Sequence, residues 1–209
     1  MGTDEAAELI AELREERSDR ADTEQFANRA ALLIALMAAT LAIGGLGGGN
    51  ATDAMIASNI RASDTWAFYQ AKNVRQTMYE IEAAELAARL PDAPAASRAE
   101  FERRLADYRA TIARYDDEPD PAAPGDPLRG EGKQQLMAQA RAFEAERAVA
   151  EARDDNFDYA EVLLQLALVL GSVAILAHNR AVLLASAVLG AIGGLLTLNG
   201  FLLLVNLPG

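Results

Sequence analysis

The chain has 209 residues, a formal net charge of −12, one histidine and no cysteine. The lack of cysteine excludes disulfide frameworks and thiolate nucleophiles, and the lone His178 argues against zinc sites and Ser-His-Asp triads. Carboxylate-only chemistry remains open, but no paired carboxylates stand out within the apolar segments. We expect no catalytic residue, no metal ion and no cofactor, and we expect that the protein is not an enzyme. The acidic balance also argues against nucleic acid as a partner, because Lys and Arg dominate binding to phosphates.

Residues 1–26 form a strongly charged N-terminal arm, with Glu16 and Arg20 at helical i,i+4 spacing. This pattern predicts a short exposed helix or a frayed arm. Residues 30–46 then carry no charge, and with the glycines that follow they are long enough to cross about 30 Å of hydrocarbon. We predict a first transmembrane helix over residues 27–49. The long acidic region before it argues against a cleavable signal peptide.

Residues 50–158 are predicted to form a helical domain outside the membrane. Its first helix, at about 51–90, shows a heptad seam of mainly apolar and small residues spaced alternately three and four apart: Ile60, Ser63, Ala67, Gln70, Val74, Thr77, Ile81, Ala84 and Ala88. Pro91 and Pro94 end this helix. The seam predicts that another helix packs along it.

Two further helices are predicted in this domain, at about 97–115 and 133–158. The segment between them, 116–132, carries prolines and glycines among acidic residues, which predicts a flexible linker. At 1.5 Å per residue, the three helices can fold back on one another as an antiparallel, coiled-coil-like stalk.

The second and third transmembrane helices are predicted over 159–177 and 181–205. Only His178, Asn179 and Arg180 separate them, so the two helices must form a tight hairpin. No helix breaker precedes the second span, and the last stalk helix is expected to enter the membrane without interruption. The fold class is therefore all-α, with the stalk inserted between the first and second spans.

The orientation follows from arginines that flank the spans. Arg14, Arg17, Arg20 and Arg29 precede the first span, and Arg180 lies in the hairpin turn on the same side. The positive-inside rule places that side in the cytoplasm and the stalk in the periplasm of a bacterial inner membrane. Arg61, Arg141, Arg147 and Arg153 near the other face are counter-evidence, although long loops translocate largely regardless of charge.

Two stretches, NIRASDTWAFYQAKNVRQTMYE at 59–80 and DNFDYAEVLLQLALVLGSVAIL at 155–176, resemble a family of bacterial membrane proteins known as domain of unknown function 4337 (DUF4337). The resemblance extends over nearly the whole chain, including the glycine-rich end of the first span and the closing hairpin. It implies a helical protein of the inner membrane, and it brings no activity, ligand or catalytic residue.

A polar and aromatic group on the first stalk helix is the candidate oligomer or partner interface: Trp66, Tyr69, Gln70, Asn73 and Thr77. Polar residues on a heptad seam can fix register and oligomer state, and the aromatics lie on a neighbouring face. The alternatives are a helix packed between two neighbours of its own chain and a ligand site. Arg147, Asp154 and Glu161 recur seven apart, as an approach to an ion path or as a solvated row.

Packing inside the membrane is predicted to use small residues and amides. Small residues four apart allow close approach of helices, and uncharged amides form hydrogen bonds across them. The candidate residues are Gly44, Gly48, Gly190, Gly194, Gln165 and Asn199.

The predicted function is that of a structural or interaction protein, an oligomeric helical scaffold anchored in the lipid bilayer. The expected partners are further copies of the chain and, as a second candidate, another membrane protein. The alternative is a small channel or transport-accessory subunit, with a pore between the spans of an oligomer.

Overall fold

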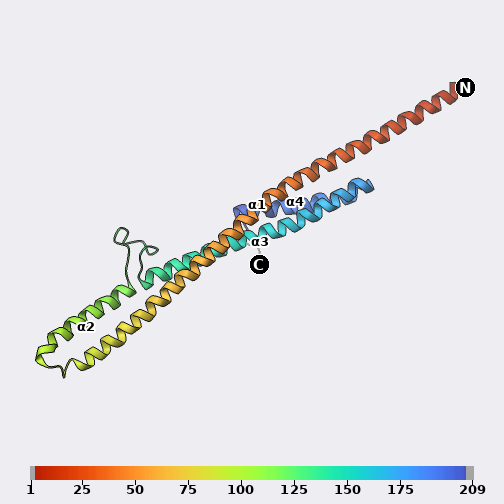
Figure 1. The fold of residues 1–209 in the computed structure, drawn as a ribbon. Coiled ribbons are helices and arrows are strands. Elements are labelled where there is room, and N and C mark those ends of the chain that lie inside the picture. Colours follow the sequence, from red (N-terminus) through yellow and green to blue (C-terminus); the bar gives the residue numbers. More distant parts are fainter. Residues whose placement is uncertain (1–2, 206–209) are drawn as a thin grey trace. The chain divides into compact units, whose positions relative to one another are not determined.

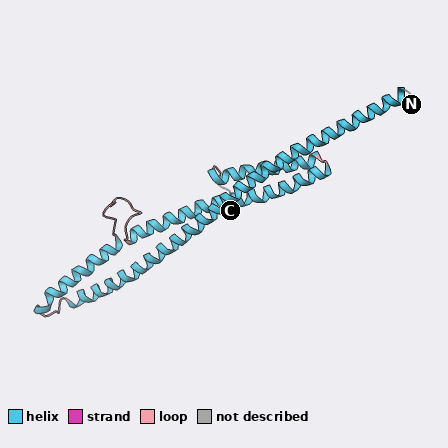
Figure 2. Cartoon of the chain, turned by 45° about the horizontal axis from the view of Figure 1, so that its top comes forward, coloured by secondary structure: helices cyan, strands magenta, loops and turns pink. Residues whose placement is uncertain are grey.

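The computed structural model describes residues 3–205, which form four helices joined by three connections (Figures 1 and 2). The side chains of residues 1–12, 15, 18 and 19 lie outside the described part. The helices are α1 (Thr3–Arg89), α2 (Ala95–Asp116), α3 (Lys133–Ala177) and α4 (Arg180–Leu202). Within residues 3–205 no strand occurs, and an isolated bridge joins Pro119 to Gly130. The all-helical fold class is thereby confirmed.

The helix α1 joins three segments that the sequence analysis separated: it covers the described residues of the arm from Thr3, the first span 27–49, and the predicted stalk helix 51–90 up to Arg89. The glycines near residue 47 do not end the helix, although glycine costs about 1 kcal/mol relative to alanine inside a helix. One reason is packing, because Gly47 and Gly48 leave room for the ring of Phe157.

The other helix bounds differ less from the sequence analysis. As expected, α3 is continuous through the predicted stalk helix 133–158 and the predicted span 159–177. The helix α4 ends at Leu202, three residues before the predicted end of the third span, and Leu203 adopts a left-handed conformation with φ of 47°. The side-chain oxygen of Asn199 accepts a hydrogen bond from the amide of Val205 and holds this end.

Contacts divide the chain into two units, which we describe separately. The apolar unit consists of Met1–Thr52 and Ala150–Gly209, and the charged unit consists of Asp53–Val149. Both α1 and α3 contribute to both units.

In the apolar unit, α1, α3 and α4 pack around a core of Met37, Leu164 and Ala167. Leu33, Ile34, Leu41, Leu168 and Leu189 pack against this core. By length and composition alone, α1, α3 and α4 are long and apolar enough to cross a membrane.

In the charged unit, α2 runs back beside α1 after a turn at residues 90–94 (Figures 1 and 2). Leu105 of α2 and Leu136 and Ala140 of α3 are buried. The ring of Tyr79 on α1 lies against Tyr108 and Tyr115 of α2, with ring centroids 5.6 and 5.9 Å apart. Aromatic contacts therefore hold much of the pairing of α1 with α2.

The segment 117–132 has hydrogen bonds of its own, where the sequence analysis predicted a flexible linker over 116–132. Asp120 donates its amide to the carbonyl of Arg129 over 3.2 Å, and Glu131 donates its amide to Glu118 over 2.9 Å. Gly130, with φ of +125°, lies so close to the backbone of Glu118 that a side chain does not fit there. These contacts close the base of the loop.

Candidate interaction surfaces

In the charged unit, α1 buries a stripe of small and polar side chains. The stripe consists of Ser58, Ala62, Lys72, Gln76 and Ala83, at spacings that follow one face of a helix. The apolar members of this fully buried stripe are alanines, and half-buried aromatic side chains of α1 lie beside it.

The heptad seam predicted from the sequence lies on the opposite side of α1, and this corrects the expectation that it packs inside the stalk. Ile60, Val74 and Ile81 are 54, 53 and 62% exposed, and every seam position from Ile60 to Ala88 is exposed. Residues that recur every three and four positions share one face, but periodicity alone does not say which of two stripes is covered by the same chain. We call Ile56 and the seam positions through Ala88 the outer stripe.

Trp66, Tyr69 and Asn73 contact α3 of the same chain. The indole N–H of Trp66 donates a 2.8 Å hydrogen bond to Glu144, and the rings of Trp66 and Tyr69 meet edge to face. Lys133 donates to the side-chain oxygen of Asn73 over 3.1 Å and lies 6.0 Å from the centre of the Tyr69 ring. The structure thus gives these three residues partners within the chain, as in the alternative of a helix packed between neighbours.

Gln70 and Thr77, the other two members of the predicted interface, are exposed on the outer stripe. The hydroxyl of Thr77 donates to the carbonyl of Asn73 in the same helix, which satisfies it without a partner. The five residues therefore do not form one surface: Trp66, Tyr69 and Asn73 face α3, while Gln70 and Thr77 face away.

Lys72 is the most enclosed charge of the charged unit, and the sequence analysis gave it no role. Its side chain is 5% exposed, and its ammonium group lies 3.0 Å from the carboxylate of Glu118 and 3.8 Å from that of Glu131. It also donates to the backbone carbonyl of Glu131 and lies over the rings of Phe68 and Tyr115. Lys72 therefore ties both ends of the loop 117–132 to α1.

A signal for Lys72 exists in the sequence. The chain has two lysines, Lys72 and Lys133, among many arginines. Lys72 lies on the polar and aromatic side of α1, and Lys133 of α3 contacts that side. A lysine presents a compact charge on a flexible stem and can reach several acceptors from a buried position. Lys72 lies on the side of α1 opposite the outer stripe, and this position in the helical repeat could have pointed to it.

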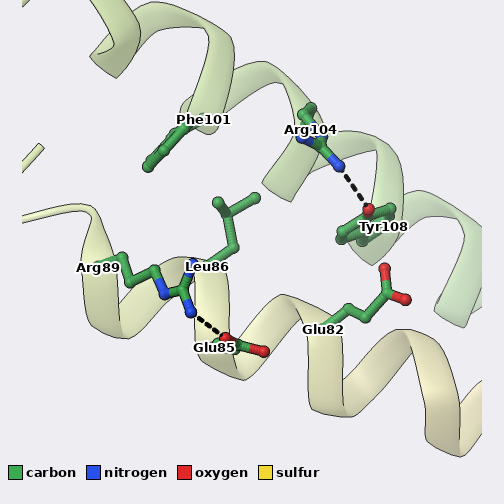
Figure 3. Close-up of a pocket in the computed structure, with 7 residues that line it drawn as sticks. All are labelled: Glu82, Glu85, Leu86, Arg89, Phe101, Arg104 and Tyr108. Carbon is green, nitrogen blue, oxygen red and sulfur yellow. Dashed lines mark hydrogen bonds and ion pairs between the residues drawn. The ribbon is translucent and has the colours of Figure 1, made fainter.

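An open depression lies between α1 and α2 near the end of the charged unit (Figure 3). Figure 3 shows Arg104 donating to the hydroxyl of Tyr108, and Arg89 paired with Glu85 one turn earlier in α1. The hydrogen bond to Tyr108 raises the pKa of the Arg104 guanidinium above its ordinary value, so this group stays charged at every working pH. Arg104 and Arg89 thus each have a hydrogen-bond partner among the residues that line the depression.

In the apolar unit, an amide pair joins α3 to α4. Asn199 donates to the side-chain oxygen of Asn156 over 2.7 Å, and Asn156, which is fully buried, donates to the carbonyl of Ala152. The buried hydroxyl of Ser186 likewise donates across to the carbonyl of Ala167 over 2.6 Å. Asn199 therefore bonds between helices as predicted for this residue type, and its partner Asn156, like the separate bond of Ser186, was not singled out by the sequence analysis.

Gln165 behaves differently from Asn199. It is exposed and donates to Glu161 of its own helix over 2.8 Å, so it does not link helices.

Glu161 belongs to the row of residues spaced seven apart, and a second member, Asp154, accepts a 2.8 Å hydrogen bond from Thr52 of α1. Arg147 also has an interaction partner. Each of the three residues of the row therefore has an interaction partner in the structure.

The predicted glycine pairs divide into inward and outward positions. A Cβ atom at Gly44 would meet Thr197 at 3.4 Å, one at Gly48 would meet Phe157 at 3.3 Å, and one at Gly190 would collide with Met37. A Cβ atom at Gly194 would meet nothing within 4 Å. Gly44, Gly48 and Gly190 thus allow close packing within the chain, and Gly194 faces outward.

The turn between α3 and α4 lies at the same end of the apolar unit as Phe26. His178, with φ of 48°, stacks on the ring of Phe26 at a centroid distance of 6.2 Å. Asn179 caps α4, because its side-chain oxygen accepts from the amides of Ala181 and Val182. The beginning of the apolar part of α1 and the hairpin turn are therefore neighbours.

Residues 26–203 match the model of a family described as a domain of unknown function, DUF4337. The matched region contains the charged unit and most of the apolar unit. No curated protein and no solved structure matches the chain.

Proposed function

The chain belongs to the DUF4337 family, whose description assigns no activity, and we propose that it is a membrane-anchored helical scaffold that works by assembly. In this proposal the apolar unit inserts in the inner membrane of a bacterium and binds lipid. The charged unit then carries the contacts to further copies of the chain and to other membrane proteins.

The observation that carries the proposal is the distribution of side-chain sizes in the apolar unit. Its buried positions include small residues such as Ala30, Ala160 and Ala174, while Leu46 and Leu176 are 74 and 86% exposed. In water each exposed leucine forgoes about 1.5–3 kcal/mol of burial. In a bilayer the same outward leucines contact lipid, and small residues inside let helices approach closely.

The orientation has support from the turn between α3 and α4. Because His178 stacks on Phe26, Arg29 and Arg180 lie toward the same end of the apolar unit. The positive-inside rule assigns that end to the cytoplasm. The charged unit is then periplasmic, and we propose this arrangement.

We propose assembly, and not catalysis, as the activity because the main features of the charged unit are an open depression and an exposed helix face. The depression beside Arg104 is open, and its charged groups include two ion-paired or hydrogen-bonded pairs. The outer stripe, in contrast, is a long apolar row in a unit otherwise rich in charge. Such a row is typical of a helix that binds another helix.

The test is performed on the full chain in its own membranes. We expect the protein to stay in the membrane pellet after washing with alkaline carbonate, and to give a particle of two or more copies when extracted in mild detergents. Release by carbonate would contradict the membrane anchor, and a monomer in native membranes would contradict assembly. Ion currents from the purified protein in planar bilayers would instead support a channel.

A further inference from the structure

We propose that the outer stripe of α1 is the contact through which two copies of this chain pair, as a parallel, in-register, two-stranded coiled coil. The inference rests on the proposed function, because it names the surface that performs the assembly. It also moves the interface away from Trp66 and Tyr69, which contact α3 of their own chain.

The first step is the contrast between the two faces of α1. Inside the charged unit, the buried stripe includes Lys72 and Gln76, and its apolar members are alanines. The outer stripe holds Ile60, Val74 and Ile81, each more than half exposed. These large aliphatic side chains thus have no partner in their own chain, whereas the aromatic side chains of the inner side do.

The second step is the period of the stripe. From Ile56 to Ala88 its positions recur alternately three and four apart without a charged residue. This repeat keeps one side of a helix facing another helix over its full length, and three to four heptads are enough for a coiled coil. A small apolar ligand would not require a row of about 50 Å.

The third step is the choice of a second copy as the partner. Copies that insert the same way into one bilayer present residue 53 of α1 at the same membrane face. Pairing of this helix with itself is then parallel, and equal positions meet: Ile60 with Ile60, Val74 with Val74, Ile81 with Ile81. β-branched residues at these positions favour two strands in parallel coiled coils.

The size of the contact also fits a dimer. The seam positions and their immediate flanks between Ile56 and Ala88 provide about 20 residues per copy, close to the 20–30 of a standard interface. Gln70 and Thr77 are polar members of the seam, and polar pairs on a seam fix the register of two helices.

The charges beside the stripe give a signature for this partner. Glu80 and Glu85 flank it on its two sides, and parallel pairing brings Glu80 of one copy toward Glu85 of the other. Because salt screens repulsion between exposed like charges, added salt should strengthen pairing of two copies. A different partner helix with basic flanks would be held less tightly as salt rises.

The absence of native cysteine makes a cross-linking test direct. Ile60→Cys and Ile81→Cys are introduced one at a time into the full chain, and membranes are oxidised mildly. In a parallel pair each cysteine meets its own copy, so each variant should form a disulfide dimer about ten-fold or more faster than Arg109→Cys, an exposed control on α2. Co-expressed Ile60→Cys and Ile81→Cys chains should give no mixed dimer, because three heptads separate the two positions.

A second pair of variants tests the energy of the contact. Val74→Glu combined with Ile81→Glu should weaken self-association at least about ten-fold, because both residues lose their apolar contact. Val149→Glu is the matched control, since Val149 is 47% exposed on α3 and lies off the stripe. Helix content by circular dichroism should be unchanged in both, because all three side chains are already exposed in one chain.

Three results would overturn the inference. The first is an assembly that persists in the Val74→Glu, Ile81→Glu variant with stripe cysteines no faster than the control, which would leave the proposed scaffold in place but move its interface. The second is a mixed dimer of Ile60→Cys with Ile81→Cys, which would show antiparallel pairing. The third is a particle of one copy with a different chain on the stripe. A monomer in native membranes would overturn both this inference and the proposed function.

Discussion

Burial of an ammonium group costs free energy unless its protons find acceptors, and Lys72 finds them at the two ends of one loop. Glu118 precedes the tip of the loop and Glu131 follows it, so the side chain of Lys72 holds both ends of the loop. The aromatic rings of Phe68 and Tyr115 cover the same group and exclude water from it. Lys72 therefore links the loop base directly to α1, while Gln135 and Gln139 link it to α3.

The first prediction concerns Lys72→Met, which keeps the length of the side chain and removes its charge. We expect the free energy of unfolding to fall by about 1–3 kcal/mol, because hydrogen bonds of a charged donor are lost while Glu118 and Glu131 regain only part of their hydration. Arg129→Met is the control, since its ion pair with Asp120 is more exposed and is worth at most about 1 kcal/mol. Urea unfolding followed by circular dichroism measures both.

Hydrogen exchange gives a local check on the same prediction. The amides of Asp120 and Glu131 close the loop base and should exchange faster in Lys72→Met. Equal stability losses in the two variants, with unchanged exchange at these amides, would show that Lys72 does not hold the loop.

At the scale of the element, α4 shows how one helix can carry two kinds of surface. Gly190 and Gly193 face other helices of the apolar unit so closely that a Cβ atom would approach Met37 and Leu164. Gly194, one position later, faces open space, as Leu195 does with most of its side chain exposed. Close packing is thus confined to one side of α4, and the opposite side carries large apolar side chains.

The second prediction compares Gly190→Leu with Gly194→Leu. The first places a branched side chain where Met37 lies and should destabilise the apolar unit by about 1–3 kcal/mol through overpacking. The second meets no neighbour and removes a helix glycine, so it should be neutral or slightly stabilising. Thermal unfolding of both variants in the same detergent decides between them. Greater damage from Gly194→Leu would mean that the outward side of α4 is packed against another subunit.

The sequence was sufficient for the elements because their signals are local. Apolar length marks the parts of α1, α3 and α4 that can cross a membrane, and prolines near residue 91 mark the end of α1. The side on which each helix packs was harder to predict. The outer stripe has the more regular repeat of apolar and small residues, while the acceptors of Lys72 lie 46 and 59 positions further along the chain. Such distant pairing leaves no periodic trace near Lys72.

The amides show the same limit inside the apolar unit. Gln165 and Asn199 have equal chemistry, and both lie within predicted spans. Asn199 reaches Asn156 on another helix, while Gln165 bonds within its own helix. Residue type therefore predicted the kind of contact, and three-dimensional packing decided which residue makes it.

At the scale of the whole molecule, the apolar unit buries small side chains around Met37 and Leu164, and the charged unit buries polar side chains together with apolar ones such as Leu105. In each unit some large apolar residues of α1 remain exposed, Leu46 in the apolar unit and Ile81 in the charged unit. Lipid is a suitable environment for the exposed apolar residues of the apolar unit, and a second helix is a suitable partner for those of the charged unit. In the proposed function, α1 therefore supplies surfaces both for anchoring and for assembly.

The third prediction is that the charged unit lies outside the cytoplasm. Gly125 in the loop is exposed, and a Cβ atom there meets nothing within 4 Å, so Gly125→Cys gives an accessible thiol in a chain that otherwise has none. The positive-inside rule assigns the end with Arg29 and Arg180 to the cytoplasm, and one span then carries the chain across the membrane, so a membrane-impermeant thiol reagent should label Gly125→Cys in intact spheroplasts. Asn179→Cys in the hairpin turn is the control and should be labelled only after lysis. The reverse pattern would place the charged unit in the cytoplasm.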